Sequence, residues 1–134
     1  MHITLRANEK IYINGAVLKP DRKVSLELMN DAVFLLQAHV MTESDATTPM
    51  RQLYYIVQLM LMEPDELAIN NTVFLQQSRA MTGVYDHPVI LEGLDRMAAL
   101  VGRRRYFDAL KVIRSLLPIE QEIIAPAPSL AQAS

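Results

Sequence analysis

The residue types that most often carry catalysis are sparse in this chain of 134 residues. There is no cysteine, which excludes disulfides, thiol nucleophiles and Cys-ligated zinc. The histidines lack the spacing of metal ligands: they are His2, His39 and His87. The pairs Ser44-Asp45 and Asp86-His87 are better interpreted as linker or helix-entry residues than as catalytic fragments. No glycine stands in a G-x-G context. We therefore expect a binding protein that is not an enzyme and needs no metal or cofactor.

The remaining candidates for a functional site are the basic residues, which could bind a polyanion such as nucleic acid. The net charge of −2 argues against broad adhesion to nucleic acid. Positive charge is nevertheless concentrated at two places, because residues 1–40 hold five basic groups and residues 86–117 hold six, against two in residues 41–85. A polyanion would therefore bind the two ends of the chain. The basic residues concerned are Arg6, Lys10, Lys19, Arg22, Lys23, Arg103, Arg104 and Arg105.

The run from Arg103 to Arg105 has two interpretations. We expect a helix over residues 103–117, and cations at its start would oppose the positive end of the helix dipole. The run is then either a solvated helix start or a cluster that grips phosphate or an acidic partner. Tyr12 and Tyr106 lie near basic residues and could stack on bases, although helical tyrosines are more often part of the core.

Methionine usage is high, with eight residues in all. Five of them fall between positions 41 and 81. They indicate either a core packed with methionine or an adaptable apolar groove for a partner helix.

The first forty residues have the pattern of short β-strands. Apolar and polar residues alternate, and Asn14-Gly15 separates two β-rich runs, which favours a type I′ hairpin. We expect an antiparallel meander or small barrel-like sheet of about five strands, at residues 3–5, 10–13, 16–18, 24–28 and 33–36. Because so small a sheet has exposed edges, we also expect a homodimer.

The rest of the chain up to residue 118 has the pattern of about four α-helices. Thr48 is a natural N-cap before Pro49, Pro64 opens a second helix, and Asp86 caps a third. Pro118 is expected to stop the last helix.

The whole is an α+β fold. We divide it into a β-rich part at 1–40, a helical part at 41–118 and a flexible, disordered tail at 119–134.

Two motifs resemble the FlbT flagellum-biosynthesis repressor family. Residues 5–17 resemble its opening L-x-P-N-E-x-x-x-I-N-G-A-V, with Ala7 in place of proline. The second motif is I-M-T-E-x-x-A-x-T-P-x-x-R-x-Y with the helix that follows it, and it is similar to residues 41–49, Arg51, Tyr54 and residues 58–60. A weaker likeness links residues 3–15 to the mRNA-binding regulators of the CsrA type, and Arg6 is the matching RNA-gripping residue.

The resemblance implies a bacterial cytoplasmic regulator that acts after transcription. Such a protein would associate with the 5′ untranslated region of flagellin mRNA and promote its decay, which restrains flagellin synthesis. RNA would then be held by the eight basic residues named above. The alternative is an adaptor whose Met- and Leu-rich helices hold flagellin or another flagellar regulator. No membrane partner is expected, because the most apolar stretch, residues 53–62, is too short to span a bilayer.

Overall fold

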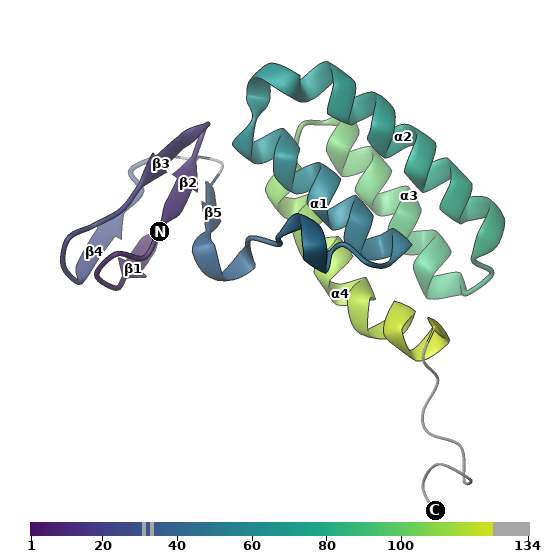
Figure 1. The fold of residues 1–134 in the computed structure, drawn as a ribbon. Helices are drawn as coiled ribbons and strands as arrows, with labels where there is room; N and C mark the ends of the chain where they lie inside the picture. Colours follow the sequence, from purple (N-terminus) through teal and green to yellow (C-terminus); the bar gives the residue numbers. More distant parts are fainter. Residues whose placement is uncertain (31, 33, 125–134) are drawn as a thin grey trace, which may run out of the picture.

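The fold, seen in a computed structural model, has a β part followed by a helical part (Figure 1). The structure describes residues 1–30, 32 and 34–124. The expected α+β class is confirmed, with five antiparallel strands before four α-helices. The strands are β1 (His2–Leu5), β2 (Ile11–Ile13), β3 (Ala16–Leu18), β4 (Val24–Glu27) and β5 (Phe34–Leu36). Val33, expected at the start of the last strand, lies outside the described residues.

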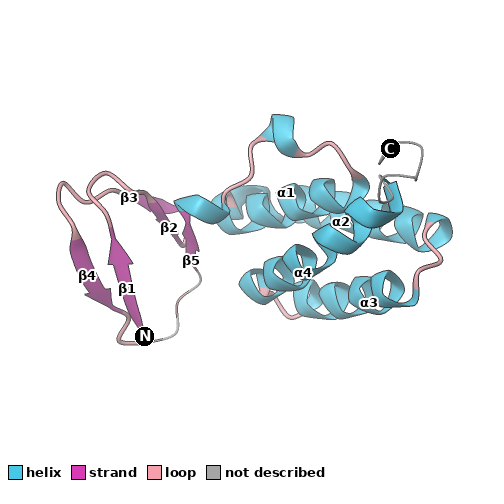
Figure 2. Cartoon of the chain, turned by 90° about the horizontal axis from the view of Figure 1, so that it is seen from below, coloured by secondary structure: helices cyan, strands magenta, loops and turns pink. Residues whose placement is uncertain are grey.

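The strands form two small sheets in which most neighbours are not consecutive in the chain. β1 pairs with β4, while β2 lies between β3 and β5. Only β2 and β3 make the predicted hairpin, and both its turn residues, Asn14 (φ 50°) and Gly15 (φ 84°), have the positive φ that a type I′ turn requires. The simple meander is therefore replaced by a β1–β4 pair and a three-stranded sheet that lie side by side (Figure 2).

Side chains of β2 and β5 alternate between two cores and so connect the β part to the helical part. On one face Ile11 and Phe34 are buried with Ile3 and Leu5 of β1 in a small cluster. On the other face Leu35 is buried in the helical core, and its partner Tyr12 packs against that core. Because successive strand residues point to opposite faces, β2 and β5 pack on both faces of the three-stranded sheet, whereas β3 is exposed.

The helical part has four α-helices and three short 3-10 turns. Its α-helices are α1 (Pro49–Met62), α2 (Leu67–Val84), α3 (Pro88–Gly102) and α4 (Tyr106–Ile124). The 3-10 turns are η1 (Gln37–His39), η2 (Glu43–Asp45) and η3 (Pro64–Glu66). α1 packs against both α2 and α4, and α3 packs on α4 (Figure 1). The predicted cap of α1 is confirmed, because Thr48 Oγ1 accepts a hydrogen bond from the backbone N–H of Arg51 at 3.2 Å.

The boundaries of two helices differ from the prediction. His87 rather than Asp86 caps α3, since its Nδ1 accepts from the N–H of Val89 at 3.2 Å. Pro118 lies inside α4, which continues to Ile124. Residues 119–124, expected in the tail, are therefore helical, and residues 125–134 lie outside the described part of the chain.

Candidate nucleic-acid interface

Two loops of the β part carry the basic residues that the sequence singled out there. Arg6 and Lys10 lie in the connection from β1 to β2, and Lys19, Arg22 and Lys23 lie between β3 and β4. The N–H of Asn8 in the first connection donates to the carbonyl of Pro20 in the second, with an N–O distance of 2.7 Å. This hydrogen bond holds the two connections together. We call residues 6–10 and 19–23 the paired basic loops.

Local sequence shapes the first of these loops. Asn8 adopts a φ of 65°, a left-handed conformation that asparagine tolerates better than most residues. Glu9 closes the turn, because its Oε1 accepts from the N–H of Arg6 at 3.0 Å and its own N–H donates to the Arg6 carbonyl at 3.1 Å. The Arg6 and Lys10 side chains remain exposed at either end of this turn.

The positive charge of the paired basic loops is poorly neutralised. Arg22 pairs with Asp21 at 3.2 Å, but both side chains are about four-fifths exposed, and such surface pairs contribute little. Within the described residues, Arg6, Lys10, Lys19 and Lys23 have no salt bridge. Five basic residues face two acidic ones across the two loops, so this surface is cationic although the whole chain is not.

The arginine run lies at the end of a helix and not at the start of one. Arg104 has a φ of 60° and donates its N–H to the carbonyl of Val101 at 3.0 Å, while the Arg105 N–H donates to Leu100 at 2.8 Å. This pair of bonds is a Schellman motif that closes α3. Cations are favourable at a helix C-terminus, so the electrostatic conflict expected from a helix start at Arg103 does not arise.

The structure separates the arginine run from the paired basic loops. Arg104 and Arg105 line a hollow with Met1, which precedes β1, whereas Arg6 follows β1. The four residues of β1 span about 13 Å at roughly 3.3 Å per residue. The sequence-predicted basic residues therefore form two patches.

The tyrosines and methionines belong mainly to the core. Tyr12 and Tyr106, the two candidates for base stacking, are half-buried against the helices. The five methionines between positions 41 and 81 are buried or half-buried: they are Met41, Met50, Met60, Met62 and Met81. They favour the interpretation of a methionine-packed core over that of an exposed groove.

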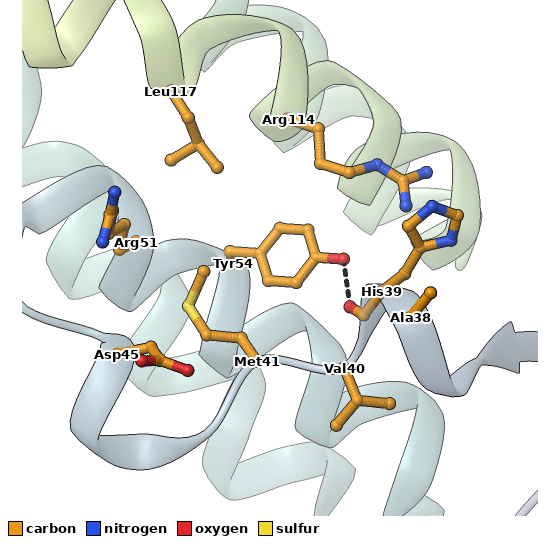
Figure 3. A pocket seen from close by; sticks show the side chains of 9 residues that line it. All are labelled: Ala38, His39, Val40, Met41, Asp45, Arg51, Tyr54, Arg114 and Leu117. Atoms are coloured by element: carbon orange, nitrogen blue, oxygen red, sulfur yellow. Dashed lines mark hydrogen bonds between the residues drawn. The ribbon is translucent and has the colours of Figure 1, made fainter. Parts of the chain in front are cut away.

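A further site, not predicted from the sequence, lies where η1 and the segment after it meet α1 and α4 (Figure 3). It is an open pocket of about 310 Å³. Val40, Met41 and Leu117 provide apolar walls, and the basic lining consists of Arg51 from α1 and Arg114 from α4. Neither arginine has a salt bridge within the described residues, and Nη1 of Arg114 is buried without a hydrogen-bond partner.

The polar neighbours of Arg114 are His39 and Tyr54, and a hydrogen bond to the backbone fixes their positions. The hydroxyl of Tyr54 donates to the carbonyl of His39, which fixes η1 against α1. Figure 3 shows the Arg114 guanidinium directed toward the His39 ring and the hydroxyl end of Tyr54. Burial raises the pKa of Tyr54, against the opposing effect of Arg114, while burial and the Arg114 charge together lower the pKa of His39. The tyrosine is therefore a neutral donor, and the imidazole favours its neutral form.

Sequence reasoning missed this pocket because its parts are far apart in the chain. Arg51 and Tyr54 fall within the segment that carries the second FlbT-like motif, but nothing in the sequence places Arg114 beside them. Arg114 and Leu117 occupy the same face of α4, at a spacing of i and i+3. The sequence signal for this pocket was the position of Arg114 next to the apolar stripe of its helix.

These observations define a small α+β protein with a cationic β surface and a pocket lined by two arginines. In the residues that the structure covers, no group of three His, Asp or Glu side chains could hold a metal ion. No helix in the described chain is long and apolar enough to cross a membrane.

The chain belongs to the FlbT family. The family model described as flagellar protein FlbT matches residues 1–124. The relatives carry the names of regulatory proteins, so the prediction of a non-enzymatic protein is confirmed.

Three curated relatives illustrate the similarity. The chain is 54% identical over 125 residues to the probable flagellum biosynthesis repressor protein FlbT 2 of Bradyrhizobium diazoefficiens, covering 93% of this chain and 92% of the relative. It is 47% identical over 131 residues to the corresponding protein of Chelativorans sp., covering 98% and 90%. For the Brucella abortus (strain S19) protein the identity is 46% over 128 residues, covering 96% and 84%. No solved structure matches the chain.

Proposed function

We propose that this protein represses flagellum biosynthesis after transcription, in the cytoplasm. It associates with the 5′ untranslated region of flagellin mRNA and promotes decay of that mRNA. The names of the relatives support a repressor of flagellum biosynthesis. The mRNA target and its decay follow from the resemblance described above, and the paired basic loops supply a surface suited to RNA.

The observation that carries this proposal is the hydrogen bond from Asn8 to Pro20. It holds together the two loops that carry five basic residues at exposed positions. RNA phosphates bind such a surface mainly by releasing counterions, which makes the affinity depend on salt. The slightly acidic remainder of the chain would limit non-specific contacts and leave the β part as the site of contact.

The test is a titration of the protein with its cognate flagellin leader RNA and with a scrambled RNA across a salt series. The variant carries R6Q, K10Q, R22Q and K23Q, all at exposed positions. Each lost phosphate contact should reduce the slope of log affinity against log salt by about 0.7 for single-stranded RNA. We expect weaker binding and a flatter slope.

A matched control removes exposed arginines from the helices instead. R79Q and R96Q change charge on α2 and α3, outside the paired basic loops. Affinity and salt slope should then stay close to those of the unmodified protein. If the loop variant kept the original affinity and slope, direct RNA recognition by these loops would be wrong.

The arginine run is the second proposed RNA patch. R103Q combined with R104Q tests it without removing Arg105, which pairs with Asp108 at 2.6 Å. We expect a smaller loss of RNA affinity than for the loop variant. Equal affinity before and after the change would exclude this patch from the RNA surface.

A second candidate function, an adaptor for flagellin, is favoured by an exposed apolar stripe on α2. Ile69, Val73 and Val84 are 63%, 40% and 79% exposed, and Ala80 lies on the same side. Their spacing puts them on one face of the helix, away from buried Phe74. Such a stripe suits contact with a partner helix.

Substitution of the stripe separates the adaptor from the RNA-binding function. I69Q with V73Q should abolish capture of purified flagellin while the thermal unfolding curve stays unchanged. V89Q, at an exposed apolar position on α3, is the control. Retained flagellin capture by the stripe variant would contradict the adaptor function.

We also propose a homodimer that uses the free edge of β3. β3 lies at the edge of the three-stranded sheet, and all three of its residues are exposed. An unpaired edge of this kind can pair with a second copy. V17K should convert a dimer into a monomer in sedimentation analysis, and a mass that does not change with V17K would argue against this edge.

A further inference from the structure

The free edge of β3 lies between a basic loop at one end and an acidic hollow at the other. We propose that two copies of this chain pair antiparallel along this edge with the two-fold axis at Val17, and that Lys19 of each copy docks at the acidic hollow of the other. The inference rests on the homodimer proposed above and adds to it the register of the strands and the charged contact. The partner that fits this surface is a second copy of the chain.

The register follows from the hairpin that β3 makes with β2. Ile13 and Ala16 flank its two-residue turn, and such flanking residues are hydrogen-bonded to each other through the backbone. Bonded and non-bonded pairs alternate along an antiparallel ladder, so Tyr12 and Val17 form a non-bonded pair. The N–H and C=O of Val17 therefore point away from β2, toward the free edge. In an antiparallel pair of β3 strands these groups can bond to Val17 of the second copy, which places the symmetry axis there.

The edge strand lacks the features that usually prevent such pairing. Native edge strands are commonly protected by lysine, by proline or by a bulge. β3 has the sequence Ala-Val-Leu and contains none of these. Val17 and Leu18 are 58% and 47% exposed, although both are large apolar side chains. A second copy along this edge would cover them.

The acidic hollow lies at the turn end of β3. Its volume is about 550 Å³, and its lining comes from the β2–β3 turn, the end of α1 and η3. A Cβ on Gly15 would lie 3.4 Å from Cγ and Cδ of Pro64, so the turn contacts the connection between α1 and α2 (Figure 1). The carboxylates of the lining are Glu63, Asp65 and Glu66, and none of them has a salt bridge within the described residues. The hollow therefore presents three negative charges that this chain leaves unpaired.

Antiparallel pairing brings this hollow next to a basic residue of the other chain. Within one chain, Gly15 and Lys19 lie at opposite ends of β3, about 13 Å apart at roughly 3.3 Å per residue. With the axis at Val17, residue 19 of one copy lies opposite residue 15 of the other. Lys19 of the second copy therefore lies at the rim of the hollow that Gly15 lines. Because the axis is two-fold, this charge-complementary contact occurs twice.

Docking of Lys19 divides the basic residues of the paired basic loops between two roles. Lys19 neutralises carboxylates of the second copy, while Arg6, Lys10, Arg22 and Lys23 remain for RNA. These four residues are the ones changed in the RNA titration, so that variant should still form the dimer. Failure of RNA binding and failure of the dimer register are therefore separate results.

Cysteine substitutions in the full chain test the register, and the chain has no native cysteine to interfere. V17C should form a disulfide-linked dimer with oxidised glutathione, because the Cα atoms of a hydrogen-bonded antiparallel pair lie about 5.5 Å apart. A16C alone should not, since its two Cα atoms would lie about 8 Å apart at roughly 3.3 Å per residue and about 4.8 Å between strands. A mixture of A16C and L18C chains should link, because these positions are opposite each other in this register.

Sedimentation analysis separates the two ways in which this test can fail. V17C that sediments as a dimer but forms no disulfide would overturn the register and leave the homodimer in place. An unmodified chain that stays monomeric at every concentration would overturn the homodimer and this inference with it.

Charge reversal tests the contact between Lys19 and the hollow. K19E, and separately E63K with E66K, should each raise the dissociation constant of the dimer about tenfold, because the lost contact occurs twice. The triple variant with K19E, E63K and E66K should return the dissociation constant close to its original value.

The matched controls carry the same changes of charge on α3. R96E corresponds to K19E, and E92K with D95K corresponds to the double acidic reversal, all at exposed positions. These variants should dimerise as the unmodified protein does. Reversals at the edge that weaken the dimer no more than the controls, or a triple variant that dimerises no better than K19E, would overturn the docking of Lys19.

Discussion

Glu120, near the end of α4, accepts a hydrogen bond from the backbone N–H of Met50 in the first turn of α1, with an N–Oε2 distance of 2.8 Å. The same carboxylate accepts from the Tyr85 hydroxyl at 2.7 Å and from the Thr48 hydroxyl. Only 1% of Glu120 is exposed. Three donors and the positive end of the α1 dipole thus compensate a buried negative charge, and this ties α4 to α1 and to the end of α2.

Removal of this carboxylate should destabilise the fold strongly. E120A leaves the Met50 N–H and two hydroxyls without their acceptor, and we expect the free energy of unfolding to fall by roughly 2–4 kcal/mol in urea titrations. E122A, at an exposed position two residues away, should change it by less than about 0.5 kcal/mol. Equal effects of E120A and E122A would show that the hydrogen bonds contribute little.

Removal of the Tyr85 hydroxyl tests one bond of this cluster. Y85F keeps the ring packed against the core and deletes only the donor to Glu120. A hydrogen bond to a charged group contributes about 1.5–3 kcal/mol, so the urea midpoint should fall measurably. In the E120A background the same change should cost much less, and additive losses would contradict a direct bond.

The contact of Glu120 also explains why Pro118 does not end the helix. Proline lacks an N–H and usually breaks a helix interior, which is why the sequence predicted a stop there. The next turn is retained because Glu120 is bonded to α1 and Ile119 packs against the core. Tertiary contacts here override a local preference.

P118A should therefore stabilise the protein. It restores one backbone donor inside α4, where alanine is favoured over proline by about 3 kcal/mol. The more flexible unfolded chain offsets part of this gain, by about 1 kcal/mol. We expect an increase of roughly 1–2 kcal/mol in the free energy of unfolding. A decrease would indicate that the proline ring makes a favourable contact.

Gly93 is required where α3 and α4 approach closely. A Cβ at this position would lie 2.3 Å from Cδ1 and 3.2 Å from Cγ of Leu116, which is itself buried. G93A gains about 1 kcal/mol in helix propensity, but overpacking costs about 1–3 kcal/mol. We expect a net loss of stability by calorimetry. G83A, with nothing within 4 Å of the added Cβ, should instead gain about 0.5–1 kcal/mol.

The sequence predicted local structure better than contacts between distant segments. The Asn14-Gly15 turn and the Thr48 cap depend on neighbouring residues, and both are present. The pairing of β1 with β4 depends on contacts across the chain, and alternation alone could not distinguish it from a meander. The sequence shows that both loops are basic. It does not show that they lie together, which only the hydrogen bond from the Asn8 N–H to the Pro20 carbonyl in the structure reveals.

His39 should make stability depend on pH in the mildly acidic range. Its folded-state pKa lies below the ordinary value of 6.5, because of burial and the Arg114 charge. As the pH falls below about 6.5, the unfolded chain binds the proton more readily than the folded one, so the free energy of unfolding decreases until the folded-state pKa is passed. H39Q should remove this part of the pH dependence in urea titrations between pH 7 and pH 5. An identical pH slope in H39Q and the unmodified protein would show that His39 titrates alike in both states, and that the field of Arg114 does not reach it.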